Sequence, residues 1–217
     1  MRPLRELIND KEPAWPLVEQ WIGEAAIDVE VLPTDRATAE AALYATQVTT
    51  RSPMGAIARN TAGLFLDTGW LRILGAGGHA RLQRSLPGWN EGRSNGYYLV
   101  ADDAVGGSFA LNGGAFGEDK GNVYYYAPDS LRWEPCEFGY SEFLVWAMTA
   151  KLRQFYESLR WEGWQAEVSR LTGDQAINVV PFLFTEGPPL EERSRRAVPV
   201  AEQYSLQLDI QRQLDGH

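Results

Sequence analysis

Few side chains in this chain are of the types that perform covalent chemistry. The sequence has only two histidines, His79 and His217, and the second is the last residue. Histidine is the commonest acid or base near neutral pH, so a histidine-assisted nucleophile would depend on His79 alone. His79 follows `GAGG`, without the strand–turn–helix frame of a nucleophile elbow. We therefore expect His79 to be a loop residue, and no catalytic residue is assigned.

Asp102 and Asp103 are the strongest candidates for a carboxylate pair. Paired carboxylates can bind a metal ion or act as acid and base. Adjacent residues of a strand, however, point to opposite sides of the sheet. Aspartate side chains also form turns by accepting backbone hydrogen bonds. The sequence therefore favours turn formation here over a metal or catalytic site, and we expect neither a metal nor a cofactor.

Two other segments have polar groups that could bind a small molecule. The segment `TTRSPMG` (49–55) is expected to be a turn-rich loop, and 75–96 a long surface loop. Arg51 and Ser52 could bind an anion, and His79 and Asn112 could complete a pocket with them. The single cysteine, Cys136, has no neighbour that would lower its pKa, so a passive thiol is expected.

The elements that would position these side chains indicate an antiparallel sheet backed by helices. A hairpin is expected over 63–74, around Asp67, Thr68 and Gly69. Tight Asp, Gly and Pro turns join the next four expected strands, and an amphipathic helix follows them from Ser141 to about Leu159. The four strands span 97–102, 107–112, 122–127 and 131–134. This pattern predicts an α+β fold with a β-meander, in a single domain over residues 1–217.

Additional elements are expected on either side of the meander. The sequence predicts a strand at 29–33 and an alanine-rich helix at 36–47. In the tail, 178–184 is expected to be a strand, and an edge strand because of Pro181. The final residues are expected to be frayed.

Composition and charge favour binding to a basic protein. Asp plus Glu number 29 against 20 Lys plus Arg, a formal net charge of −9. An acidic surface repels nucleic acid and anionic membranes and steers basic proteins, although a net negative charge would equally serve solubility alone. Exposed tyrosines and tryptophans next to aspartates are typical of interface hot spots, although buried cross-strand aromatic pairs would explain the same residues. The residues proposed as partner contacts are Asp102, Asp103, Tyr124, Tyr126, Asp129, Trp70 and Trp89.

The motifs also resemble known families. The chain is similar over nearly its whole length to an uncharacterised bacterial family, through `EPAWPL`, `TTRSPMGA`, `GWLRILG`, `ALNGGAFG` and `LRWEGW`. More distantly, about residues 60–155 resemble the core of the SUKH superfamily, through `YYLVADDAVGGSFALN`, `GNVYYYAPDSLRWEP` and `GYSEFLVWAM`. That resemblance implies an immunity protein that neutralises a toxin by binding it. The chain lacks the `LP-x-x-Y/L-x-x-F/L` helix of that superfamily and has extensions at both ends.

We therefore expect a non-enzymatic protein-binding module, with a toxin-neutralising immunity protein as its narrower form. The target would be a basic toxin such as a nuclease, with no nucleic acid or membrane as partner. The alternative is a small-molecule-binding protein or enzyme that uses Arg51, Ser52, His79 and Asn112 in the loops 49–55 and 75–96. One cysteine, no apolar run of membrane-spanning length and no secretion signal lead us to expect a cytoplasmic location. The oligomeric state is left open.

Overall fold

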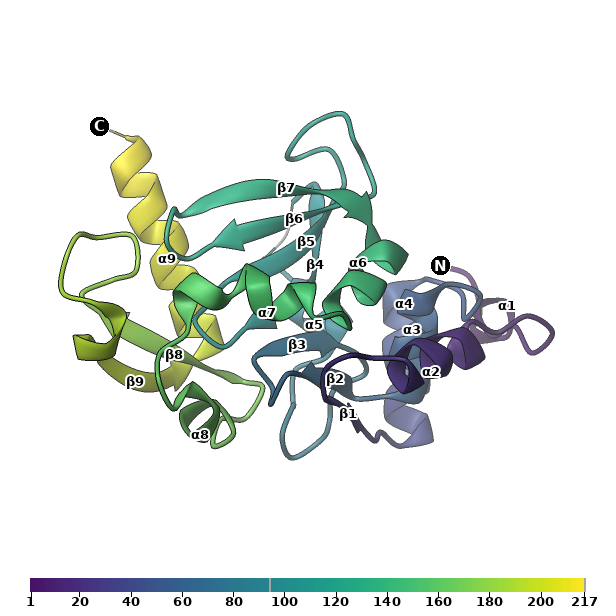
Figure 1. The fold of residues 1–217 in the computed structure, drawn as a ribbon. Coiled ribbons are helices and arrows are strands. Elements are labelled where there is room, and N and C mark those ends of the chain that lie inside the picture. Colours follow the sequence, from purple (N-terminus) through teal and green to yellow (C-terminus); the bar gives the residue numbers. More distant parts are fainter. Residues whose placement is uncertain (94, 217) are drawn as a thin grey trace.

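The computed structural model describes residues 1–93 and 95–216, so His217 lies outside the described residues. Its centre is a seven-stranded sheet in which every strand pairs antiparallel with its neighbours in sequence (Figure 1). The strands are β1 (Val29–Leu32), β2 (Gly63–Leu66), β3 (Leu71–Leu74), β4 (Tyr97–Asp103), β5 (Ser108–Asn112), β6 (Asn122–Ala127) and β7 (Arg132–Gly139). The prediction of an α+β fold with an antiparallel meander is therefore confirmed.

Helices cover both faces and one end of this sheet. The helices that precede and interrupt the meander are α1 (Leu4–Leu7), α2 (Trp15–Gly23), α3 (Arg36–Thr46), α4 (Pro53–Asn60) and α5 (Leu86–Asn90). The strip that crosses one face of the sheet consists of α6 (Tyr140–Ala147), α7 (Lys151–Phe155) and the 3₁₀ turn η1 (Glu157–Leu159), followed by α8 (Trp164–Val168). Phe143 of α6 packs on Phe109 of β5 with ring centroids 4.9 Å apart, which fixes this strip over the centre of the sheet.

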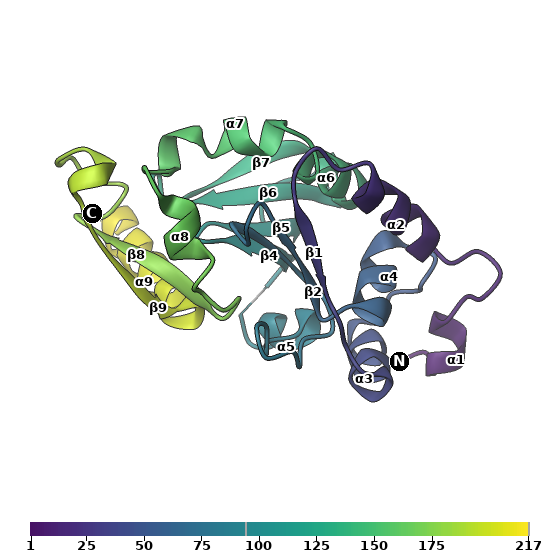
Figure 2. The same cartoon turned by 60° about the horizontal axis from the view of Figure 1, so that its bottom comes forward.

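The last part of the chain forms a hairpin and a helix on the side away from α1–α4 (Figure 2). It consists of β8 (Gln175–Val180), the 3₁₀ turn η2 (Leu190–Glu192), β9 (Ser194–Pro199) and α9 (Val200–Asp215). Ile177 N donates to Ala104 O at 2.7 Å, and the hydroxyls of Tyr97 and Tyr204 lie 3.0 Å apart. The C-terminal unit therefore packs on the opposite face of the sheet from α6, through Tyr204 of α9.

The helix predicted from Ser141 to Leu159 is interrupted. Its cap is Gly139 and not Ser141, because Glu142 at the third helical position accepts from Gly139 N at 3.2 Å. The break follows Ala147, where the Thr149 hydroxyl donates to Trp146 O at 2.8 Å and accepts from Lys151 N at 3.3 Å. A threonine hydroxyl that bonds backbone groups in this way competes with the helical ladder.

Four other expectations need correction. The segment 49–55, expected to be a loop, runs into α4 at Pro53, because Ser52 accepts from Gly55 N at 3.1 Å and Pro53 takes the first helical position. The segment 75–96, of which Ser94 is not described, contains α5 and buries Leu82 and Trp89. The final residues, expected to be frayed, belong to α9, which begins at Val200 and ends at Asp215. The strand expected at 178–184 is present as β8, but it begins at Gln175 and ends at Val180.

Candidate functional site

Asp102 and Asp103 are buried structural residues and do not form a partner-binding surface. Arg72 Nε donates to Asp102 Oδ1 at 2.8 Å, and Arg84 forms a second ion pair with the same carboxylate. Asp103 Oδ1 accepts from the backbone of the turn that joins β4 to β5, at 2.9 Å from Val105 N and 2.8 Å from Gly107 N. The expectation of turn formation is confirmed for Asp103, and the proposed exposure of both side chains was wrong.

Burial changes the titration of the Asp103 side chain. The carboxyl group is fully enclosed, and this desolvation raises its pKa although the Tyr125 hydroxyl donates to Oδ2 at 2.7 Å. The same burial, followed by the nearby Asp103 carboxylate, raises the pKa of Tyr125 well above its ordinary value. Through these hydrogen bonds the two groups join the β4–β5 turn to β6.

The aromatic residues proposed as contacts are also buried. Tyr124 donates to Asp119 at 2.9 Å beneath the 113–121 loop, and Tyr126 lies under α9 with its hydroxyl 3.4 Å from Gln207 O. Trp70 stacks under the Arg160 guanidinium at 4.7 Å, and Trp89 lies between two arginines. The expectation that at least one of three consecutive tyrosines is exposed was wrong, because Tyr124, Tyr125 and Tyr126 are covered on both faces of the sheet.

The four residues of the alternative ligand pocket do not line a common cavity among the described residues. Arg51 pairs with Glu12 at 2.7 Å in solvent, and Ser52 caps α4. His79 Nδ1 accepts from Arg81 N at 3.2 Å, and Asn112 accepts from Gly114 N at 2.7 Å within its own loop. Ser52, His79 and Asn112 therefore stabilise local backbone structure, whereas Arg51 pairs with the N-terminal segment, and the grouping of the four into one binding site stays a prediction.

Asp129 is the one proposed contact that is exposed, and it lines a groove. The groove has a volume of about 460 Å³ and lies between the β6–β7 turn, η1 and the segment that leads to β9. Its lining residues are Asp129, Ser158, Leu159, Leu183, Gly187, Pro188, Pro189, Leu190 and Arg193. We call this the acidic groove, after Asp129 and the glutamates that lie next to its lining residues in the chain.

Four further exposed carboxylates lie next to lining residues in the chain. They are Glu157, Glu186, Glu191 and Glu192. Like Asp129, they make no side-chain ion pair with any residue in 1–93 or 95–216. Only one cation lines the groove, Arg193, whose guanidinium donates to the carbonyls of Pro181, Phe182, Thr185 and Pro188. Arg193 therefore holds the wall in place, while Asp129 is the one carboxylate among the lining residues.

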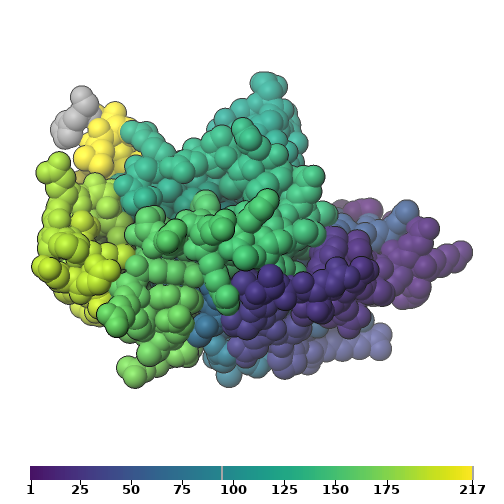
Figure 3. Space-filling view, viewed as in Figure 1, coloured from purple at the N-terminus to yellow at the C-terminus, as the bar shows by residue number. Residues whose placement is uncertain are grey.

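A second groove lies at the other end of the α6–α7–η1 strip. It also has a volume of about 460 Å³, and its lining is mainly apolar. The lining residues are Phe138, Ser141, Glu142, Val145, Trp146, Thr149 and Lys151. We call this the apolar groove. In the space-filling view, the green surface of the strip adjoins the yellow-green surface of the C-terminal hairpin (Figure 3).

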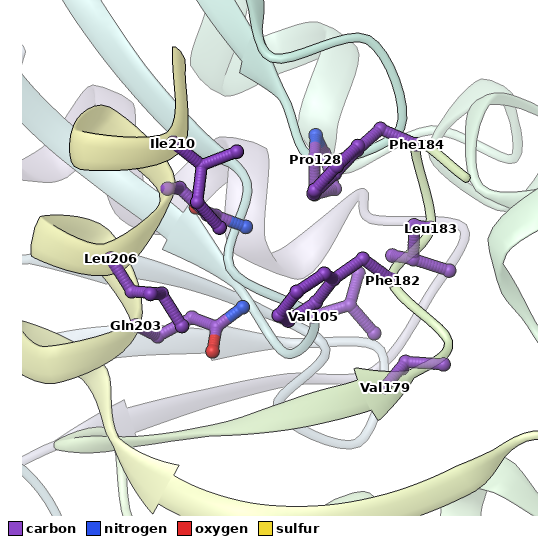
Figure 4. Close-up of a pocket in the computed structure, with 10 residues that line it drawn as sticks. Val105, Pro128, Val179, Phe182, Leu183, Phe184, Gln203, Leu206 and Ile210 are labelled. Atoms are coloured by element: carbon purple, nitrogen blue, oxygen red, sulfur yellow. The ribbon is translucent and has the colours of Figure 1, made fainter. Parts of the chain in front are cut away.

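The cleft between α9 and residues 182–184 is too narrow for a ligand (Figure 4). Phe182 and Phe184 stack at 5.2 Å on one side, and Leu206 and Ile210 face them from α9. The cavity of about 10 Å³ has room for roughly one water molecule. The buried Oε1 of Gln207 lacks a hydrogen-bond donor in the protein, which suits such a water.

Two kinds of feature, a cluster of metal ligands and a membrane-spanning helix, are absent from the residues that the structure describes. Within residues 1–93 and 95–216, no three His, Cys, Asp or Glu side chains gather closely enough to hold a metal ion. No helix in these ranges has the length and apolar character needed to cross a membrane. Cys136 is half-buried, and burial, then the Glu134 carboxylate, raises the pKa of its thiol to about 12.

Comparison with other proteins identifies the family of the chain. It is 43% identical over 213 residues to the putative uncharacterized protein YbfG of Escherichia coli (strain K12), a match that covers 97% of each chain. It is 38% identical over 212 residues to an uncharacterized protein of Haemophilus influenzae, covering 94% of this chain and 92% of the relative. These matches confirm the expected bacterial family of unknown function, while the SUKH resemblance stays a prediction. Residues 4–203 match the family described as "Protein of unknown function DUF2625", and the chain belongs to that family.

Proposed function

We propose that this chain is a protein-binding module whose acidic groove receives a basic segment of a partner protein. The observation that carries the proposal is a groove lined by the exposed and unpaired carboxylate of Asp129, with four more exposed and unpaired glutamates next to its lining residues in the chain. Exposed carboxylates without cationic partners attract the lysine or arginine side chains of a partner. The apolar floor of Leu159, Leu183 and Leu190 would pack against the methylene stems of those side chains.

A toxin-neutralising role is the narrower form of this proposal. It is supported by the net charge of −9 and by the SUKH-like motifs in residues 60–155. Enzymes that act on nucleic acid carry basic surfaces, so an acidic groove is complementary to that class of toxin. Co-expression with a basic nuclease toxin encoded next to a family member should restore growth, and neutralising the groove should abolish that protection.

The general proposal is tested with a fluorescein-labelled decapeptide of lysine and arginine. Three proteins are compared by fluorescence anisotropy at low and high salt: the native chain, a groove variant (Asp129→Asn, Glu157→Gln, Glu186→Gln) and a control variant (Glu6→Gln, Asp10→Asn, Glu19→Gln). The control residues are exposed on the N-terminal segment, so both variants lose the same charge. We expect at least tenfold weaker binding for the groove variant alone. Equal affinity of the three proteins would refute the proposal.

A further inference from the structure

Strand β9 has one edge to which no other strand binds among the described residues. The C-terminal sheet in this part of the chain consists of β8 and β9, and β9 lies on the outer side of β8 (Figure 1). Ala197, in the middle of β9, is exposed to solvent. An open strand edge presents backbone donors and acceptors to which another chain can bind.

The hydrogen bonds of β8 show which backbone groups of β9 point outward. Ile177 is paired with Ala197, yet Ile177 N donates to Ala104 O at 2.7 Å on the other side of β8. In an antiparallel pair, residues that exchange hydrogen bonds alternate with residues whose N–H and C=O groups point away from the partner strand. Ala197, and with it Arg195, therefore directs its backbone N–H and C=O away from β8.

The end of the hairpin agrees with this alternation. Val200 N donates to Asp174 O at 2.9 Å, which places Val200 among the residues that bond across the hairpin and Pro199 among those that point outward. Pro199 has no N–H and ends the edge. The outward N–H groups of β9 are therefore those of Arg195 and Ala197, and no backbone carbonyl elsewhere in residues 1–93 or 95–216 accepts from them.

The side chains along this edge are basic on both faces. Arg195 faces α8, where its Nε lies 3.3 Å from Glu167 Oε2 and its guanidinium lies 4.7 Å from the Trp161 ring. Arg196 is exposed on the opposite face, because side chains alternate along a strand. The Glu167 carboxylate is engaged, since it also accepts from Trp161 Nε1 at 2.9 Å.

A groove beside the edge adds a third guanidinium. It has a volume of about 260 Å³ and is lined by Glu167, Arg170, Leu171, Gln175, Ile177, Arg195, Arg196 and Ala197. The side chains of Arg170 and Arg196 make no ion pair with any residue in the described ranges. In a chain with a net charge of −9, two unpaired guanidinium groups next to an open strand edge favour an acidic occupant.

A second copy of this chain is a poor occupant of the edge. Pairing β9 with β9 of another copy would place arginines opposite arginines, and like charges on neighbouring strands are destabilising. The outer edge of β7 does not suit β9 either. It contains Pro135, which has no N–H, and Glu137 has a φ of 62°, which interrupts the extended backbone.

We infer that β9 receives an extended acidic segment of a partner protein, which adds to the hairpin as a third strand. The outward groups of Arg195 and Ala197 bond the main chain of the segment. Because successive side chains of a strand alternate between its faces, two adjacent carboxylates reach Arg196 on one face and Arg170 on the other. This site is separate from the acidic groove and does not depend on the proposed function.

Three fluorescein-labelled octapeptides of valine and threonine test the chemistry of the segment. The first has two adjacent glutamates at its centre, and the second has glutamines there. The third keeps the glutamates but has a proline on either side of them, which removes one N–H from each edge of the extended peptide. Affinities for the native protein are measured by fluorescence anisotropy. We expect the first peptide to bind at least tenfold more tightly than the other two.

Three protein variants locate the site. Ala197→Pro removes an outward N–H and leaves the bonds to β8 in place, so it should weaken binding of the first peptide at least tenfold. Arg196→Gln should weaken it about threefold, the effect of one cross-strand charge pair. Arg5→Gln is the matched control, because Arg5 is an exposed arginine on α1, and it should bind normally. Circular dichroism and unfolding midpoints check that the variants fold.

Each part of the inference can fail separately. Equal binding of the glutamate and glutamine peptides would refute the acidic specificity. Full affinity of the proline peptide, or of Ala197→Pro, would refute strand addition, and the proline peptide decides this point if Ala197→Pro does not fold. A dimer in light scattering that Ala197→Pro disrupts would assign the edge to a second copy. If none of the three peptides binds, the inference fails, while the acidic groove, tested with a basic peptide, is unaffected.

Discussion

Arg72 and Asp102 form an ion pair across β3 and β4 in which both side chains are only 1% exposed. Arg72 also donates from Nη1 to Gln175 O at 2.9 Å, at the start of β8. The pair therefore joins the seven-stranded sheet to the C-terminal hairpin. The adjacent pairing of the Asp102 carboxylate with Arg84 extends the connection to the 75–85 segment.

Removing one partner of this pair should destabilise the protein strongly. Asp102→Ala leaves the buried Arg72 guanidinium without a carboxylate and removes one of the two carboxylates that pair with Arg84. Such a loss typically costs about 3–5 kcal/mol. Replacing both Arg72 and Asp102 with apolar residues should cost less than the sum of the single replacements. Urea denaturation of the two single variants and the double variant gives the coupling. Strictly additive free energies of unfolding would show that the pair contributes nothing as a unit.

Asp103 should contribute a pH-dependent part of the stability. Its folded-state pKa is raised above the ordinary value of 3.8, chiefly by burial. Its contribution to stability is therefore fully present below pH 3.8 and is lost as pH rises through the folded-state pKa. Asp103→Asn removes this dependence, so the variant should gain stability relative to the native protein between about pH 4 and pH 7. A relative loss over that range, measured by urea denaturation, contradicts the assignment.

Arg193 should control the order of the acidic groove wall. Lysine has a compact ammonium group and cannot reproduce the guanidinium contacts with four carbonyls, so Arg193→Lys should loosen residues 182–190. We expect faster amide hydrogen exchange there, with a change in global stability below about 1 kcal/mol. Arg196→Lys, an exposed neighbour on β9, is the matched control. Exchange rates unaltered by Arg193→Lys would show that the hydrogen bonds from Arg193 to the four carbonyls do not order the groove wall.

Cys136 should react slowly with thiol reagents. With a pKa of about 12 instead of 9.0, its thiolate fraction at pH 8 falls on the order of a thousandfold. Labelling with Ellman's reagent should therefore be much slower in the native protein than in denaturant. Comparable rates in the two conditions would show that the thiol is accessible and ordinary.

The meander was predictable because its signals are local. Asp67 and Gly69 mark the β2–β3 turn, and Asp103 to Gly107 mark the β4–β5 turn by side-chain hydrogen bonds that span only a few residues. Helix α9 was missed because its buried face includes Gln203 and Gln207, which weakens the apolar periodicity that indicates a helix.

The candidate site was mostly not predictable, because burial depends on contacts that are distant in sequence. In `VADDAV`, Asp102 is paired with Arg72 and Arg84, and Asp103 accepts from its own turn. In `VYYY`, Tyr124 is covered by the 113–121 loop, Tyr125 by Phe155 of α7 and Tyr126 by α9. Asp129 was found because it lies in an obvious turn. The accompanying Glu186, Glu191 and Glu192 follow the cis-proline segment, and their clustering near `GPP` was the signal that could have indicated the groove.

Hydrogen exchange of the native chain with and without the lysine–arginine decapeptide tests the central claim most directly. A segment of the partner that occupies the acidic groove should slow exchange in residues 128–130, 157–159 and 183–193 and leave α1–α4 unchanged. Uniform exchange, or protection confined to another surface, would contradict the assignment of the basic-partner site to this groove.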